Sequence, residues 1–141
     1  MMNAAQQSVG PKGHILCVDD EHDILSIAQT SLEAIGGFEV TVCNSGPEAL
    51  DVLRNFQPDL VLLDVMMPNM GGPATLKAIK ELPNCADLPI VFMTARVQPS
   101  EVEAYLAMGA KQVISKPFDP MTLSDQVQGI LDLQLQHKKT E

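Results

Sequence analysis

Hydrophobic residues in this chain gather in five short runs, separated by longer stretches in which apolar positions recur every three or four residues. Each run has four to six residues and is bounded by polar or turn-forming residues, a pattern typical of β-strands. The five predicted strands are 14–19, 39–43, 60–64, 90–94 and 112–115.

The stretches between the runs predict helices. In the first stretch, seven residues recur at helical spacing, and Gly36-Gly37 supplies a stop after them. These seven residues are Ile24, Leu25, Ile27, Ala28, Ser31, Leu32 and Ile35. Two Ser-x-x-Glu capping boxes, a proline at the start of a helix, and a capping carboxylate followed by a first-turn proline mark the starts of the other helices. These starts are Ser45, Pro73, Ser100 and Asp119-Pro120.

Strand and helix alternate five times along residues 14–136. Parallel strands need a crossover connection, and the helix in each crossover covers a face of the sheet. The pattern therefore predicts a single α/β domain, in which ligands bind outside the carboxyl ends of the strands. We expect residues 1–13 to form a flexible leader, because they are polar and lack a period, and residues 137–141 to form a short tail.

The composition narrows the class of protein. Of the 141 residues, 45% are hydrophobic, 4% aromatic and 19% charged, as expected for a globular protein with an aliphatic core. The formal net charge of −9 repels nucleic-acid phosphates and argues against direct DNA binding. The longest apolar run, 60–63, is too short to span a bilayer and no secretory signal is present, so we expect a cytoplasmic protein. The three cysteines lack a metal-binding pattern and are interpreted as reduced thiols.

Reactive side chains are concentrated at the ends of the predicted strands. Asp19-Asp20 ends the first strand, Asp64 the third and Thr94 the fourth, and Lys116 follows the fifth. Three carboxylates at one edge of a sheet repel one another unless a cation lies among them. Oxygen ligands without His or Cys favour Mg²⁺, which also accepts phosphate oxygens. Each residue alone has an ordinary structural interpretation, as a turn residue, a strand residue or a solvated charge, but their combination favours a site.

Four short segments contain these residues: Val18-Asp19-Asp20-Glu21, Leu63-Asp64-Val65-Met66-Met67-Pro68, Met93-Thr94-Ala95 and Ser115-Lys116-Pro117-Phe118. The spacing is 44 residues from Asp20 to Asp64, 30 from Asp64 to Thr94 and 22 from Thr94 to Lys116. These segments and intervals resemble the response-regulator receiver family of two-component signalling systems, over about residues 14–136. The resemblance implies a flavodoxin-like sheet of five parallel strands in the order 2-1-3-4-5.

The resemblance also implies roles for individual residues. Asp64 would be the phosphoacceptor, a carboxylate nucleophile that forms an acyl phosphate. Asp19, Asp20 and Asp64 would hold Mg²⁺, for which Mn²⁺ can substitute, together with the backbone carbonyl of Met66. Lys116 would bind a phosphoryl oxygen, and the family implies a cis peptide bond between it and Pro117.

This chain departs at one position from the switch that the family resemblance implies. Thr94 would hydrogen-bond the phosphoryl group and draw its loop inward. Many receivers have an aromatic residue three positions before the lysine, where this chain has Val113. We therefore expect the loop after Thr94 and the fourth helix to carry any rearrangement.

The implied partners are other proteins. A sensor histidine kinase or a histidine phosphotransfer protein would supply the phosphoryl group. Because few residues follow the fifth helix, we expect a stand-alone receiver, monomeric or weakly dimeric. It would bind a downstream protein through the face formed by helix four, strand five and helix five.

Three alternatives remain open. The first is a degenerate receiver that is never phosphorylated and binds its partner constitutively. The second is a phosphatase with an aspartate nucleophile, as in the haloacid dehalogenase superfamily, which would need an acid two residues after Asp64, where Met66 stands. The third, a nucleotide-binding flavodoxin-like protein, would need glycines in the first strand-helix turn, which is acidic instead.

Overall fold

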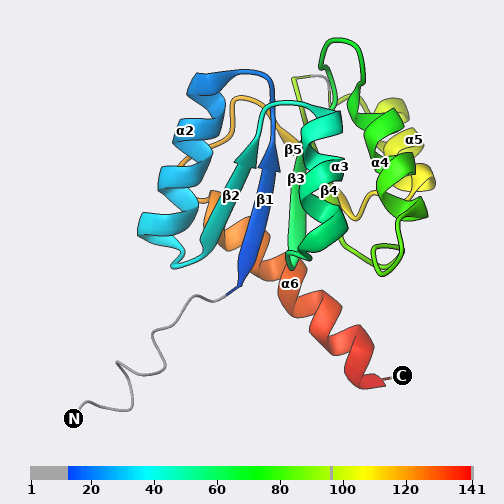
Figure 1. Cartoon of the computed structure of the whole chain (residues 1–141). Coiled ribbons are helices and arrows are strands. Elements are labelled where there is room, and N and C mark those ends of the chain that lie inside the picture. The colour runs from blue at the N-terminus through cyan, green and yellow to red at the C-terminus, as the bar shows by residue number, and fades with distance from the viewer. Residues whose placement is uncertain (1–12, 96, 141) are drawn as a thin grey trace.

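A computed structural model of the chain places five parallel strands in one sheet (Figure 1). The structure describes residues 13–95 and 97–140, with side chains described as far as residue 136. The strands are β1 (His14–Val18), β2 (Glu39–Cys43), β3 (Leu60–Asp64), β4 (Ile90–Thr94) and β5 (Gln112–Ser115). Their order across the sheet is β2-β1-β3-β4-β5, which confirms the predicted flavodoxin-like α/β architecture.

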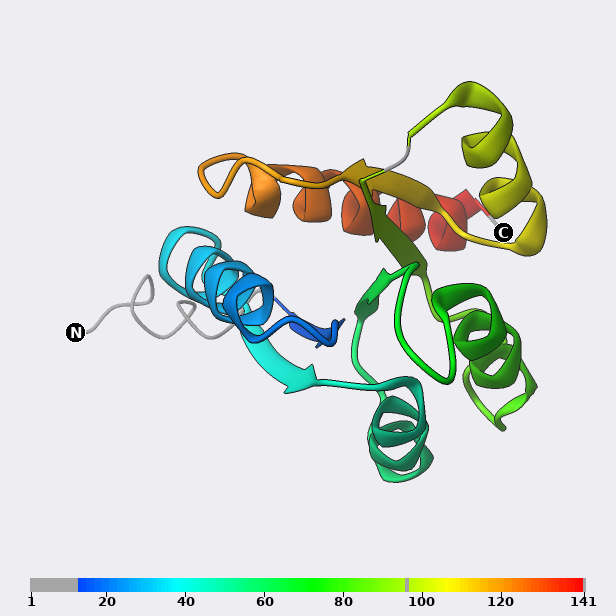
Figure 2. The same cartoon turned by 90° about the horizontal axis from the view of Figure 1, so that it is seen from above.

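Helices cover both faces of the sheet, as the view from above shows (Figure 2). On one face, α2 (His22–Thr30) continues into a π-helical turn, η1 (Ser31–Ile35), and lies beside α6 (Leu123–Thr140). On the other face lie α3 (Gly46–Asn55), α4 (Gly72–Glu81) and α5 (Pro99–Met108). This is the two-layered cover that the alternation of strands and helices predicts.

The alternating direction of side chains along each strand divides the core in two. Ile15 and Cys17 of β1 belong to the cluster shared with α2, η1 and α6, whereas Leu16 and Val18 belong to the cluster shared with α3 and α4. All residues of β3 and β4 are buried, because these central strands have helices on both sides. The polar residues that end these two strands are therefore also held in buried positions.

Local capping determines where some of the helices begin. Ser45 Oγ accepts a hydrogen bond from the N–H of Glu48 at 3.2 Å, and the Glu48 side chain reaches back to the preceding backbone, which confirms the capping box there. The capping box predicted at Ser100 is wrong. Helix α5 begins at Pro99, after Gln98, whose side chain makes no capping bond. The proline at the first helical position sets the start instead.

One helix start and one helix face differ from the prediction. The Asp119 carboxylate accepts a hydrogen bond from the N–H of Met121 at 2.9 Å, in a turn that delays the start of α6 to Leu123. Ile27 and Ile35 fit the helical spacing of the first helix but are 43% and 47% exposed. Periodicity identifies an apolar face without showing that another element covers it.

The entry to α4 packs tightly against the end of β3. A Cβ atom at Gly72 would lie 2.5 Å from the backbone oxygen of Asp64 and 2.8 Å from the Cα of Val65. The Gly72 N–H donates a hydrogen bond to the carbonyl of Val65 at 2.9 Å. Glycine allows this close approach, so Gly72 fixes the path of the chain as it leaves Asp64.

The ends of the predicted domain are only partly described. Residues 1–12 of the predicted leader lie outside the described residues, and α6 continues through residues 137–140 of the predicted tail. Within the described part of the chain, no helix combines the length and apolar character that crossing a bilayer requires. Cys17, Cys43 and Cys85 are all free and buried.

Candidate functional site

The polar residues that end the strands meet at one edge of the sheet, the edge seen from above in Figure 2. Asp19 directly follows β1, Asp64 and Thr94 are the last residues of β3 and β4, and Lys116 directly follows β5. These four strands are neighbours and run parallel, so their carboxyl ends coincide. The sheet thus brings together the residues that the sequence predicts to form the site.

Two of the acidic residues are deeply placed. Asp19 and Asp64 have exposed fractions of 0% and 2%, and Thr94 is equally buried, whereas Asp20 is exposed. The backbone positions Asp19, because its N–H donates to the carbonyl of Cys43 at 3.1 Å and its Oδ1 accepts the N–H of Glu21 at 2.9 Å. A buried carboxylate is costly unless a positive charge compensates it.

Lys116 supplies that compensation. Its Nζ lies 3.0 Å from Oδ2 of Asp19 and 3.0 Å from Oδ1 of Asp64, and its side chain is 12% exposed. The N–H of Lys116 donates to the carbonyl of Thr94 at 2.9 Å, which ties the residue to the end of the neighbouring strand. The peptide bond between Lys116 and Pro117 is cis, as the family resemblance implies.

The charged groups in this cluster shift one another's pKa values. Burial raises the pKa of Asp64 to about 6, the hydrogen bond from Lys116 opposes this shift, and the charges of Asp19 and Asp20 add to it. Burial lowers the pKa of Lys116, but hydrogen bonds to Asp19 and Asp64 outweigh burial and leave that pKa above its ordinary value. Asp64 is therefore mostly ionised at neutral pH, and Lys116 is fully charged.

The carboxylates can also hold a metal ion. Asp19, Asp20 and Asp64 each offer one oxygen, and these three oxygens lie within 4.8 Å of one another. The single ammonium of Lys116 leaves part of their negative charge uncompensated. Closely spaced carboxylate oxygens without nitrogen or sulfur donors match the preference of Mg²⁺, so the residues fit a divalent cation of this kind.

A pocket of about 350 Å³ borders the cluster. The residues that line it are Glu21, Ile24, Asp64, Met66, Thr94, Ala95, Lys116 and Pro117. Met66 lines this pocket and is 71% exposed.

Sequence reasoning assigned no role to Glu21. Its Oε1 lies 3.3 Å from Nζ of Lys116, which makes it a third carboxylate on the same ammonium. The sequence indicated a role for Glu21 only through its position, because it directly follows Asp19-Asp20 and precedes α2. Its long side chain allows it to reach Lys116 across the site.

Comparison with known proteins identifies the family. The family model for the response regulator receiver domain matches residues 15–128. The chain belongs to this family. Among curated proteins, the response regulator SaeR of Staphylococcus aureus (strain USA300) is 37% identical to this receiver over 118 residues, which are 84% of this chain and 50% of SaeR.

Solved receiver structures are similar to this one over most of their length. The chemotaxis response regulator CheY4 of Vibrio cholerae is 31% identical, with a TM-score of 0.78, and the match covers 83% of this chain and 97% of CheY4. The DrrB receiver domain, in a structure described as BeF3 activated, is 26% identical with a TM-score of 0.74, over 85% of this chain and 97% of that one. The chain spans about half the length of the curated relatives it matches. What is shared with them is the receiver domain, a signalling module of two-component systems.

Proposed function

We propose that this receiver accepts a phosphoryl group on Asp64 in a Mg²⁺-dependent reaction and that the phosphorylated form switches the binding of a partner protein. The observation that carries this proposal is the position of Lys116 Nζ, 3.0 Å from both Asp19 and Asp64, beside a cluster of three carboxylate oxygens. A buried carboxylate with a lysine on one oxygen and a cation site beside it is arranged for nucleophilic attack on phosphorus.

The proposed reaction transfers the phosphoryl group from a phosphohistidine of a sensor kinase or phosphotransfer protein. A carboxylate oxygen of Asp64 attacks the phosphorus atom, a new O–P bond forms, and the N–P bond of the donor breaks. The released imidazole takes a proton from solvent. Lys116 leaves its carboxylate partners to donate a hydrogen bond to a phosphoryl oxygen, as a point charge rather than a bidentate group.

Asp19, Asp20 and Asp64 would hold the metal ion, and family resemblance adds the backbone carbonyl of Met66. Mg²⁺ supplies charge neutralisation for the phosphoryl oxygens and for the carboxylates around them, and Mn²⁺ would serve in the same way. The motif Asp64-Val65-Met66 has no acidic group two residues after Asp64 to protonate a leaving alcohol, which disfavours a phosphatase.

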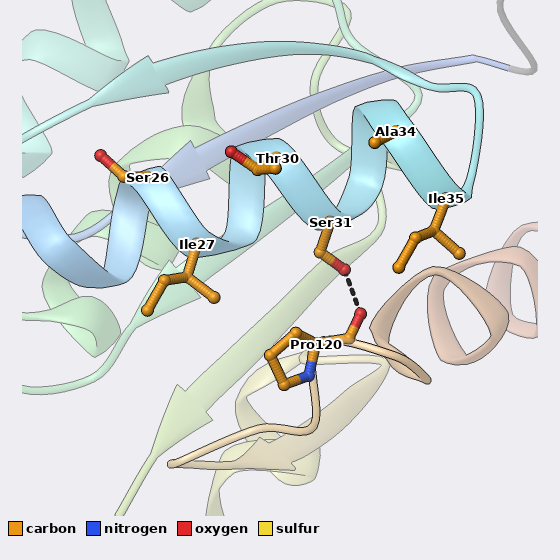
Figure 3. Close-up of a pocket in the computed structure, with 7 residues that line it drawn as sticks. All are labelled: Ser26, Ile27, Thr30, Ser31, Ala34, Ile35 and Pro120. Carbon is orange, nitrogen blue, oxygen red and sulfur yellow. Dashed lines mark hydrogen bonds between the residues drawn. The ribbon is translucent and has the colours of Figure 1, made fainter.

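The phosphodonor would dock along α2 and η1, beside the reactive edge. Figure 3 shows Ile27 and Ile35 on either side of Ser31, whose hydroxyl donates a hydrogen bond to the carbonyl of Pro120. These residues line an apolar groove, and one turn before Ile27 on the same helix, Ile24 lines the pocket at Asp64. A donor helix placed along Ile24, Ile27 and Ile35 would bring its histidine to Asp64. We expect Ile27→Glu to slow transfer from a phosphorylated donor protein while transfer from acetyl phosphate stays unchanged; equal slowing of both would contradict this docking.

The change caused by phosphorylation would reach the downstream protein through Thr94 and α5. Thr94 ends β4, and α5 follows the next loop. None of the ten residues of α5 is fully buried, although Tyr105 packs on Phe92 with ring centroids 5.1 Å apart, so less packing opposes movement of α5 than of a helix with buried residues. The exposed face of α5, β5 and α6 is the proposed site for the downstream protein. A cytoplasmic location fits a protein that receives its signal from a kinase.

The decisive experiment follows the intact mass of the protein with acetyl phosphate, with and without Mg²⁺. We expect a gain of one phosphoryl group that requires both Mg²⁺ and Asp64. Asp64→Asn should abolish the gain, whereas Asp125→Asn, which removes an exposed acid of α6, should not alter it. No gain in the wild type would favour the degenerate receiver, and sustained release of phosphate from many phosphoesters would favour the phosphatase.

A further inference from the structure

A second groove lies away from the phosphorylation site, between α4 and α5. Its volume is about 550 Å³, and none of the residues that line it belongs to the pocket at Asp64. Leu76 is buried at its floor, while Pro73, Ala74 and Met108 add apolar surface. Met108 is 45% exposed, so the apolar surface is accessible from solvent.

Unpaired positive charges surround this groove. Of the lysine and arginine side chains that the structure describes, Arg54 and Lys116 form ion pairs with carboxylates. The other three, Lys77, Lys80 and Lys111, form none within 4.0 Å. Lys77 and Lys80 line the groove, and Lys111 lies close enough to Lys80 to affect its titration. In a chain with a net charge of −9, this is a local concentration of cations.

Lys80 is held in place beside the apolar floor. A Cβ atom at Gly109 would lie 2.9 Å from its Cε, so the aliphatic stem packs over the end of α5, and its Nζ donates to the carbonyl of Ala86 at 3.3 Å. Burial and the charge of Lys111 lower the pKa of Lys80, although Asp87 partly opposes this. Glu81 also lines the groove, without forming an ion pair with these lysines. A further carboxylate is therefore favoured here.

We propose that the α4–α5 groove binds an acidic amphipathic segment of a partner protein. An apolar side chain of the segment would cover Ala74 and Met108, while carboxylates on either side would pair with Lys77 and Lys80. A nucleic acid is disfavoured, because none of the described residues that line the groove is aromatic and the net charge of the chain is negative. The proposal does not depend on phosphorylation of Asp64.

The test uses three synthetic peptides of one length. The first carries leucines at helical spacing with glutamates between them, the second has glutamine in place of each glutamate, and the third has serine in place of each leucine. Binding to the full chain is measured by fluorescence anisotropy and mapped by amide chemical shifts, in buffer without Mg²⁺ or phosphodonor. We expect the first peptide to bind and to shift the amides of α4 and of residues 108–111, and the other two to bind more weakly.

Matched variants separate the groove from net charge. The double variant Lys77→Gln/Lys80→Gln should weaken binding about fivefold, the loss expected for two exposed charge contacts. Arg54→Gln, which removes a positive charge from α3, should leave affinity unchanged, and Ala74→Glu should block the groove. The proposal would be overturned if Arg54→Gln weakened binding equally, if the amide shifts were confined to α2 and η1, or if no binding occurred at millimolar peptide. Self-association through the groove, detected by sedimentation and abolished by Ala74→Glu, would assign it to a second copy of the chain instead.

Discussion

Replacing Asp64 with asparagine should stabilise the metal-free protein at neutral pH. Burial and the neighbouring charges of Asp19 and Asp20 raise the pKa of Asp64 from 3.8 to about 6, despite the hydrogen bond from Lys116. A difference of about 2 pKa units corresponds to about 3 kcal/mol of unfolding free energy. Asparagine keeps the shape of the neutral carboxyl group and an acceptor oxygen for Lys116, and the loss of the charged hydrogen bond from Lys116 is already included in the raised pKa. We therefore expect a net gain of up to about 3 kcal/mol.

The way the unfolding free energy changes with pH follows from the raised pKa of Asp64. The native state binds a proton on Asp64 more tightly than the unfolded chain does, so the unfolding free energy of the wild type falls as the pH rises from about 4 to about 6. The advantage of Asp64→Asn should therefore be small at pH 4, grow between pH 4 and 6, and be complete at pH 7. Urea unfolding followed by circular dichroism in EDTA measures these differences.

Controls make the result specific to the site. Asp125→Asn on the exposed face of α6 should change the unfolding free energy little at any of these pH values. Addition of Mg²⁺ should stabilise the wild type through binding to the native state, and should stabilise Asp64→Asn much less. If Asp64→Asn were less stable than the wild type at pH 7 in EDTA, or if its advantage were the same at pH 4 and pH 7, the electrostatic account of the site would be wrong.

Four further predictions concern the helices and the buried residues outside the site. Ser45→Ala should cost about 1 kcal/mol in urea unfolding, because Glu48 loses its capping acceptor; no loss would show that the cap is redundant. Gly72→Ala should destabilise the fold by about 3 kcal/mol or more, since its Cβ would meet backbone atoms, whereas Gly129→Ala, with open space around it in α6, should stabilise by about 0.5–1 kcal/mol. The native protein should react slowly with a thiol reagent at pH 8, and fast reaction of folded protein would contradict the burial of its thiols. Burial raises the pKa of Cys17 to about 12 and of Cys43 to about 11, and raises that of Cys85. Amide hydrogen exchange should be faster in α5 than in α4, and similar rates would show that α5 is anchored by contacts other than buried side chains.

The sheet could be predicted from the sequence because its central strands are buried on both faces. Such strands read as unbroken apolar runs, as β3 and β4 do. The bounds of β2, β3, β4 and β5 match the prediction, and β1 ends one residue earlier than predicted, at Val18. The same burial made Asp64 and Thr94 conspicuous, as polar residues that end otherwise apolar runs. Their convergence followed from topology alone, since the carboxyl ends of adjacent parallel strands lie at one edge of the sheet.

What the sequence could not predict depends on contacts between elements. A Ser-x-x-Glu spacing occurs at both Ser45 and Ser100, but only the first has the extended backbone that places its hydroxyl on the helix N–H groups. The exposure of Ile27 depends on whether another helix covers that face, which periodicity does not reveal. The reach of Glu21 to Lys116 likewise depends on side-chain geometry across the site.

The absence of an aromatic residue at Val113 does not require a different switch. Val113 and Tyr105 of α5 are both partly buried against the same core cluster, so Val113 is a packing residue, whereas Thr94 is held at the end of β4 by the sheet. We expect a movement that starts at Thr94 to be passed to α5, which has no fully buried residue and contacts the core through Tyr105, whose ring centroid lies 5.1 Å from that of Phe92. We therefore expect α5, rather than an aromatic ring at position 113, to carry the rearrangement, because each of the other four α-helices that the structure describes has buried residues and α5 has none.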